Sequence, residues 1–180
     1  NNGEVTGNGI LGGITAVQGA TAGNNVCHYI QCVNNGDITA TATQAVSSSA
    51  MAGIAAFYSP GSVFEYCINT GFVTNTKSVY TAGIAANNKG NATADYPVVF
   101  KGCVNTGNIA SSAQQIAGIV AYITNYTSVD SCLNYGTIEQ GIWGAAGICY
   151  TMAGTTSSLT NCINYGDVSV TQYNAGGIVG

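Results

Sequence analysis

The acidic side chains are the first candidates for chemistry, because paired carboxylates can hydrolyse glycosidic bonds. Of the seven Asp and Glu residues, Glu4, Asp37 and Asp167 each follow the glycine of a recurring Asn-x-Gly element. Glu4 and Asp37 would lie about 5 Å apart if consecutive elements stack, a separation that retaining glycosidases use. No His or Arg accompanies the pair, and the equivalent residues of the next three elements are Phe72, Asn108 and Thr137. We therefore predict solvated turn residues and no enzyme, with a β-helix carbohydrate-active enzyme as the alternative.

Metal chemistry has one candidate group in the sequence, formed by Cys27, His28 and Cys32. Zinc sites of this kind need Cys-x-x-Cys pairs or a second His, and the chain has neither. A single His also leaves no Ser-His-Asp arrangement. We predict no metal and no other cofactor.

Five of the seven cysteines occupy the same position of the recurring element, so they are expected to stack above one another. Stacked strands bring Cα atoms within disulfide-bonding range, and an extracellular protein permits such bonds. A buried free Cys also packs as a small hydrophobe, and a reduced thiol ladder is the preferred interpretation. The residue after each Cys is apolar too, so the pattern does not decide which set faces inward. The five cysteines are Cys32, Cys67, Cys103, Cys132 and Cys162.

Four aromatic residues are candidates for contact with a ligand. Tyr135 and Tyr165 occupy the middle position of successive Asn-x-Gly elements, while Trp143 and Tyr173 each follow the element's asparagine by the same interval. Each pair is therefore expected to stack across neighbouring coils. Exposed rings on a rigid surface form a platform for sugars. The alternative is ring stacking that only strengthens the sheet.

A repeat that covers the whole chain must position these side chains. A Cys-apolar-Asn-x-Gly-x-Ile/Val element recurs, each copy is followed by a Gly-Ile pair, and the residues between are typical of strands and turns. Such units bury their apolar faces only by stacking. We predict an all-β fold: a right-handed parallel β-solenoid of about 5–6 coils with roughly 30–36 residues per coil, in a single domain over residues 1–180. The coils start near residues 1, 32, 67, 103, 132 and 162.

The Asn-x-Gly step has an expected structural role in each coil. Its glycines, such as Gly36 and Gly71, are predicted to have positive φ and to bend the coil sharply. The asparagines are predicted to form a ladder in which each amide donates to the next carbonyl. They are Asn34, Asn69, Asn105, Asn134 and Asn164.

The repeat resembles the GLUG-type repeats of bacterial cell-surface and secreted proteins. The resemblance covers essentially the whole chain and is best at Ala175-Gly176-Gly177-Ile178-Val179-Gly180, whereas several copies lack the closing Val-Gly. Such repeats occur in large adhesin-like proteins and beside the catalytic domains of some secreted peptidases. The resemblance implies an extracellular, non-catalytic module of a bacterial surface protein that serves as an adhesin stalk or ligand-binding scaffold. A carbohydrate-binding module and an accessory region beside a peptidase are the alternatives.

Composition limits the partners. Charged residues make up 6% of the chain, and the formal net charge is -4, so there is no basic surface for nucleic acid. No apolar run approaches the length of a membrane-spanning helix, and no membrane insertion is predicted. The expected partner is a host or environmental glycan or protein. The chain begins and ends inside the repeat, so we expect a fragment of a longer protein whose open strand edges associate end to end.

Three polar stretches interrupt the regular spacing and are predicted to protrude as loops. They are residues 18–25, 41–49 and 87–95, of which the first and last are expected on the same side of the solenoid.

Overall fold

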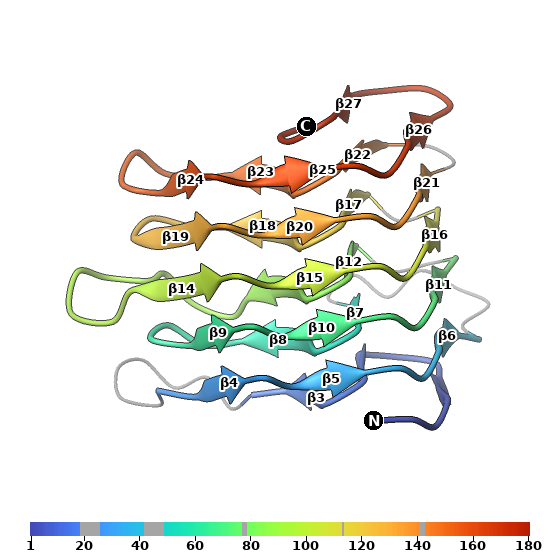
Figure 1. Cartoon of the computed structure of the whole chain (residues 1–180), viewed down its shortest axis with the longest axis horizontal. Helices are drawn as coiled ribbons and strands as arrows, with labels where there is room; N and C mark the ends of the chain where they lie inside the picture. The colour runs from blue at the N-terminus through green and yellow to red at the C-terminus, as the bar shows by residue number, and fades with distance from the viewer. Residues whose placement is uncertain (19–25, 42–48, 77–78, 113, 141–142) are drawn as a thin grey trace.

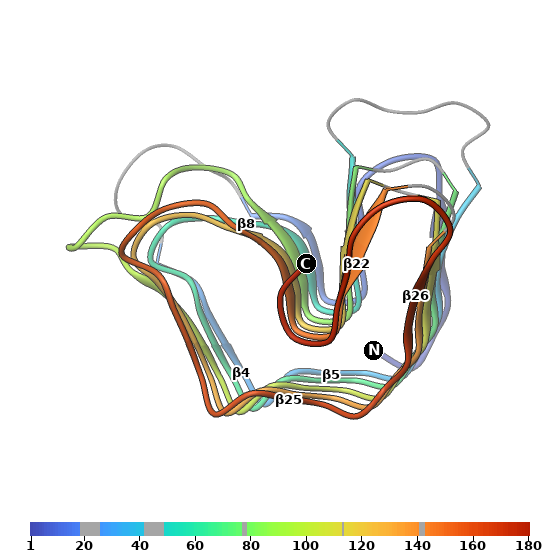
Figure 2. The same ribbon diagram turned by 90° about the horizontal axis from the view of Figure 1, so that it is seen from above.

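The computed structural model describes residues 1–18, 26–41, 49–76, 79–112, 114–140 and 143–180. Within these ranges the regular elements are all β-strands, and no helix is present that would be long and apolar enough to cross a membrane. The strands stack in parallel into five sheets, A to E, which the chain visits in that order in every coil (Figure 1). The fold is the right-handed parallel β-solenoid that the repeats predict (Figures 1 and 2).

Sheets A and B have six strands each. Sheet A contains β1 (Val5–Gly7), β6 (Ile38–Ala40), β11 (Val73–Asn75), β16 (Ile109–Ser111), β21 (Ile138–Gln140) and β26 (Val168–Val170). Sheet B contains β2 (Leu11–Gly12), β7 (Ala50–Ala52), β12 (Tyr80–Ala82), β17 (Gln115–Ala117), β22 (Gly144–Ala146) and β27 (Ala175–Gly176).

The other three sheets have five strands each. Sheet C contains β3 (Thr15–Val17), β8 (Ala55–Tyr58), β13 (Ala85–Asn88), β18 (Val120–Ile123) and β23 (Cys149–Met152). Sheet D contains β4 (His28–Ile30), β9 (Val63–Glu65), β14 (Val98–Lys101), β19 (Thr127–Asp130) and β24 (Ser158–Thr160). Sheet E contains β5 (Val33–Asn34), β10 (Ile68–Asn69), β15 (Val104–Asn105), β20 (Leu133–Asn134) and β25 (Ile163–Asn164).

The coil is deeply indented between sheets B and C, as the view along the stack shows (Figure 2). The Gly-Ile turns form the tip of the indentation and touch the asparagines of sheet E. A Cβ atom on Gly83 would lie 2.4 Å from Cγ of Asn105, so no larger residue fits at this contact. The repeated glycine therefore permits the wall of the coil to reach the opposite sheet.

This contact accompanies a division of the interior into two separate cores. The larger core lies among sheets C, D and E, where the rings of Tyr29, Phe64 and Phe100 stack with centroids 4.5 and 4.7 Å apart. The smaller core lies between sheets A and B, where Ile109 and Ile138 pack against Ile116. Both cores consist of columns of like residues, which explains why the repeats stack in register.

A third apolar cluster fills the indentation on the outside of the coil. Its alanines lie on the outward faces of sheets B and C, because their strand neighbours Met51 and Ala55 belong to the two inner cores. Small side chains permit the two sheets to approach closely there. The buried members are Ala50, Ala52, Ala56, Phe57 and Ala86.

The asparagines form a continuous hydrogen-bonded ladder through the stack. Each Nδ2 donates to Oδ1 of the asparagine in the next coil over 2.7 or 2.8 Å, from Asn1 to Asn164, and the four between Asn34 and Asn134 are fully buried. From Asn34 onward, each Nδ2 also donates to the carbonyl of the glycine two residues later. Both amide protons are thus bonded at the inner positions.

The predicted positive φ at the Asn-x-Gly glycines is wrong. The left-handed conformation occurs instead just before each repeat cysteine, at the corner between sheets D and E. Gly71 is required for another reason: a Cβ atom there would lie 2.1 Å from the carbonyl oxygen of Gly36 in the preceding coil. Close stacking, not bending, selects glycine at this position. The corner residues are Gln31 (φ 52°), Tyr66 (54°), Gly102 (59°), Ser131 (54°) and Asn161 (53°).

Candidate functional site

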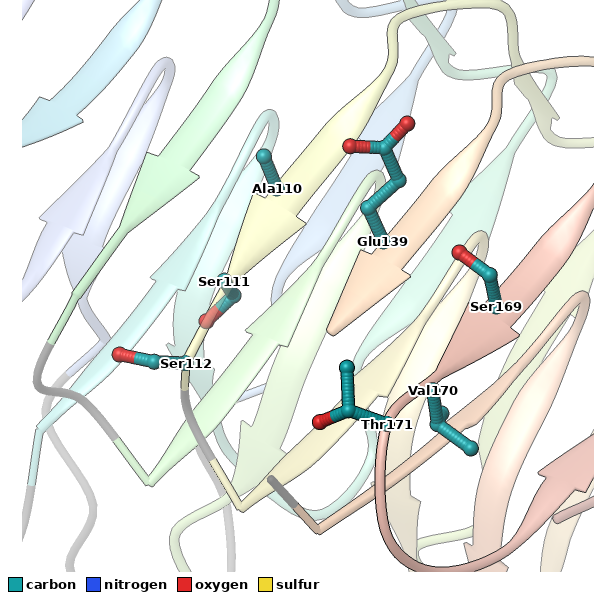
Figure 3. Close-up of a pocket in the computed structure, with 7 residues that line it drawn as sticks. All are labelled: Ala110, Ser111, Ser112, Glu139, Ser169, Val170 and Thr171. Atoms are coloured by element: carbon teal, nitrogen blue, oxygen red, sulfur yellow. The ribbon is translucent and has the colours of Figure 1, made fainter. Parts of the chain in front are cut away.

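A shallow depression of about 400 Å³ crosses the last three strands of sheet A (Figure 3). Its lining includes outward-facing residues, the buried Ser111, and Val170, which packs against the smaller core. Its centre is the register row in which Ala110, Glu139 and Ser169 are neighbours on β16, β21 and β26. Successive side chains of a strand point to opposite faces of the sheet. Ile109, which precedes Ala110, and Val170, which follows Ser169, pack in the smaller core, so this row faces outward.

Ser112 and Thr171 border the depression beyond the ends of β16 and β26. Ser111 also lines it but is buried, and its hydroxyl lies 3.4 Å from Oγ1 of Thr81. Thr81 Oγ1 in turn accepts a 2.8 Å hydrogen bond from Nδ2 of Asn75. This network fixes one wall of the depression to the interior of the coil.

Several polar groups of the depression are not used by the fold. Among the described residues, none forms a hydrogen bond with the side chains of Glu139, Ser169 or Thr171, and all three residues are exposed. Ser112 differs, because its hydroxyl donates to the carbonyl of Thr76. The depression therefore presents a carboxylate and two hydroxyls to solvent on a rigid sheet.

The two aromatic pairs that the sequence singles out are both stacked. The rings of Tyr135 and Tyr165 lie 4.8 Å apart with a 10° interplanar angle, and those of Trp143 and Tyr173 lie 5.5 Å apart with 23°. The pairs do not form one patch, because Tyr135 precedes β21 and Trp143 follows it. Neither pair lines the depression, but Tyr173 follows the lining residue Thr171 by two residues, so the Cα atoms of these two residues lie at most about 7 Å apart.

The cysteines of the recurring element face the larger core, and all seven cysteines are free thiols. Hydrogen bonding to Cys132, together with burial, raises the pKa of Cys103 to about 12. Burial raises the pKa of Cys149 to about 12. At the end of the column, the hydrogen bond with Cys132 lowers the pKa of Cys162 to about 7. The apolar residues after these cysteines face outward, as the exposure of Val33 and Ile163 illustrates.

Asp37, one of the two carboxylates of the alternative enzymatic pair, takes part in the stacking of the coils. Oδ1 of Asp37 accepts a 2.9 Å hydrogen bond from the backbone N of Phe72 in the next coil. Asn108, at the equivalent position, accepts one from Thr137 N in the same way. Asp130 accepts hydrogen bonds from Thr160 and Asn161, which lower its pKa. Within the described residues, no three His, Cys, Asp or Glu residues are grouped as metal ligands would be.

Sequence reasoning did not select the depression. Glu139 was one of seven acids, and Ser169 and Thr171 had no distinctive spacing. A usable signal was the register: the row that contains Glu139 otherwise contains small or hydroxyl-bearing residues such as Thr74, Ala110 and Ser169, so the acid departs from it. Of the predicted loop 87–95, Asn87 and Asn88 belong to β13, and residues 89–95 lie between sheets C and D. Residues 19–25 and 42–48 lie outside the described residues.

Comparisons with known proteins gave no match, whether with protein-family models, with curated proteins or with solved structures.

Proposed function

We propose that this chain is a non-catalytic extracellular repeat module of a bacterial surface protein. In this role it is a stiff adhesin stalk or scaffold that presents a binding face to a host or environmental glycan or protein. The resemblance to GLUG-type repeats supports the surface setting. The small number of charged side chains agrees with a partner that is neither nucleic acid nor an anionic membrane.

The unbroken asparagine ladder is the observation that carries this proposal. It links every coil to the next through side-chain hydrogen bonds, which are buried between Asn34 and Asn134. Buried, fully bonded polar networks favour one arrangement over others, because any shift in register would leave buried amides without partners. A stack joined in this way is expected to behave as one stiff body, which is what a stalk or a rigid display surface requires.

The positions of the carboxylates favour this proposal over an enzyme. A glycosidase needs two carboxylates on either side of the bond that it cleaves. The depression contains one, Glu139, while Asp37 is bonded to the backbone of the next coil. Among the described residues that line the depression, none supplies a second acid.

Display on a non-adhesive bacterium tests the proposal. Cells that display the chain should adhere to at least one of a set of glycan-coated or matrix-protein-coated surfaces more strongly than cells that display a flexible Gly/Ser linker of equal length. The purified chain should release no soluble sugar from the same polysaccharides. Sugar release that is lost in Glu4→Gln or Asp37→Asn would replace this proposal with an enzymatic one. Adhesion no greater than that of the linker on every surface would refute the binding role.

A further inference from the structure

We infer that the depression on sheet A, together with the stacked Trp143–Tyr173 pair, is a binding site for a neutral saccharide. This inference rests on the proposed role as a binding scaffold and names the site and the ligand class. It assigns recognition to one of the two aromatic pairs and adds the polar residues Glu139, Ser169 and Thr171.

The proposed site combines an aromatic platform with unused polar groups. A sugar ring has an apolar C–H face, which packs on the electron-rich face of an aromatic ring, and a rim of hydroxyls that need hydrogen-bond partners. Trp143 and Tyr173 are 48% and 59% exposed, so ring surface is available. The carboxylate of Glu139 accepts strong hydrogen bonds from hydroxyls, and the hydroxyls of Ser169 and Thr171 both donate and accept.

The strands hold the polar groups of the proposed site in a rigid arrangement. Glu139 and Ser169 lie on directly paired strands, in the register Glu139↔Ser169, and Ser111 is tied to Thr81 in the interior. Binding groups on strands lose little conformational freedom when a ligand arrives, which lowers the entropic cost of binding. The volume, about 400 Å³, is within the range of about 300–1,000 Å³ that is usual for small-molecule sites.

The charge of the site selects a neutral ligand. The described residues that line the depression include one carboxylate and no Lys, Arg or His, and the chain has a net charge of -4. Uronic acids and sulfated sugars would be repelled by Glu139. Neutral sugars would instead donate their hydroxyls to it.

The chain contains a single tryptophan, so its fluorescence reports directly on this site. The intact chain is titrated with neutral oligosaccharides of glucose, N-acetylglucosamine, mannose and galactose, and separately with a uronic-acid oligosaccharide. At least one neutral sugar should change the emission of Trp143 and protect it from a soluble quencher, and the acidic sugar should not. No change with any neutral sugar, at concentrations up to its solubility limit, would overturn the inference and leave the stalk proposal intact.

Variants locate the site by calorimetry, which does not depend on the tryptophan. Trp143→Ala should weaken binding of the responsive sugar about tenfold, equivalent to about 1.4 kcal/mol. Glu139→Gln should weaken it about fivefold and remove the discrimination against the acidic sugar. Phe72→Ala is the matched control, because it removes a half-exposed ring that directly precedes β11 of sheet A and does not line the depression. This variant should bind the sugar normally. Full binding by folded Trp143→Ala, or loss of binding in Tyr165→Ala, would place the site elsewhere and overturn the inference.

Discussion

An asparagine of the ladder should contribute more to stability where it lies between two other coils than at the end of the stack. Asn105→Ala tests this expectation. Asn105 makes three buried hydrogen bonds through its side chain: it donates to Gly107 O (2.8 Å) and Asn134 Oδ1 (2.7 Å), and it accepts from Asn69 Nδ2 (2.8 Å). Removal of the amide leaves three buried groups unpaired. At about 1–3 kcal/mol for each orphaned group, the expected loss is about 4 kcal/mol in the free energy of unfolding. That is a large part of the about 5–15 kcal/mol typical of a domain.

The comparison variant is Asn164→Ala in the last coil. Asn164 accepts from Asn134 and donates to Gly166 O, but it is only partly buried, so water can replace its bonds. The expected loss is about 1–2 kcal/mol. Urea unfolding is followed by far-ultraviolet circular dichroism and by Trp143 emission, and coincident transitions establish two-state behaviour. A loss for Asn105→Ala no greater than that for Asn164→Ala would refute the reasoning.

A nearly isosteric change separates hydrogen bonding from packing. Asn105→Asp keeps the shape but replaces the donor with an acceptor, which then faces Asn134 Oδ1 and Gly107 O. Burial raises the pKa of the new carboxyl above its unfolded value of about 3.9. The protonated Asp side chain therefore contributes its full stabilisation below that unfolded pKa, and this contribution is lost as the pH rises through the folded pKa. The deficit relative to the unmodified chain should therefore shrink toward about pH 4, and a pH-independent deficit would show that packing dominates.

Three further perturbations test the packing and the thiols. Gly118→Ala should lower the free energy of unfolding by about 3 kcal/mol, because its Cβ would lie 2.2 Å from Gly147 O. Gly9→Ala is the control and should be nearly neutral, because a Cβ atom there would have nothing within 4 Å. Equal melting temperatures of the two variants would contradict this prediction. Ile119→Asp should cost about 4 kcal/mol or more by placing a charge in the larger core, while Val33→Asp on the outer face should cost little in the same urea titration. In native protein at pH 8, alkylation should modify Cys162 before Cys103 and Cys149, as peptide mass spectrometry can measure. Because the pKa values of Cys103 and Cys149 are raised from 9.0 to about 12, the stabilisation by their protonated thiols should be complete below pH 9 and be lost as the pH rises toward 12. A urea midpoint that stays unchanged over that interval would contradict this prediction.

The sequence was sufficient to predict the solenoid because repeated residues at matching positions must stack. Asn69 lies beside Asn105 and Asn34, as the spacing requires, and the strand pairs keep this register throughout. The indentation was not predictable by the same reasoning. Ala52 and Ala56 have the composition of core strand residues, and they are indeed buried, but outside the coil between sheets B and C. Which side of a wall a small apolar residue covers depends on contacts between sheets that no local pattern specifies.

The error at the glycines has a related cause. Asn-x-Gly is a turn signal in an isolated chain, where glycine usually supplies a positive φ. In a stack, the preceding coil adds a second constraint, and Gly71 meets it by leaving space for the carbonyl of Gly36. The true left-handed corner residues have no common residue type: Tyr66, Gly102 and Asn161 occupy equivalent positions. Tertiary contacts impose this conformation, so the sequence carries no signal for it.

The fifth coil shows where such a repeat is free to acquire function. It contains Tyr150 where other coils have an alanine in the indentation, such as Ala56 and Ala86. Glycine at position 144 leaves space for this ring, because a Cβ atom on Gly144 would lie 2.2 Å from the hydroxyl of Tyr150. The change is thus compensated within the indentation, while the buried asparagine and the core isoleucine of the same coil keep their places. Glu139 and Trp143 belong to this coil as well. Because inner positions must match their neighbours above and below, whereas outer positions need only avoid clashes, departures from the repeat collect on the outside. The outer face of a coil that carries such departures is therefore the first place to seek a ligand.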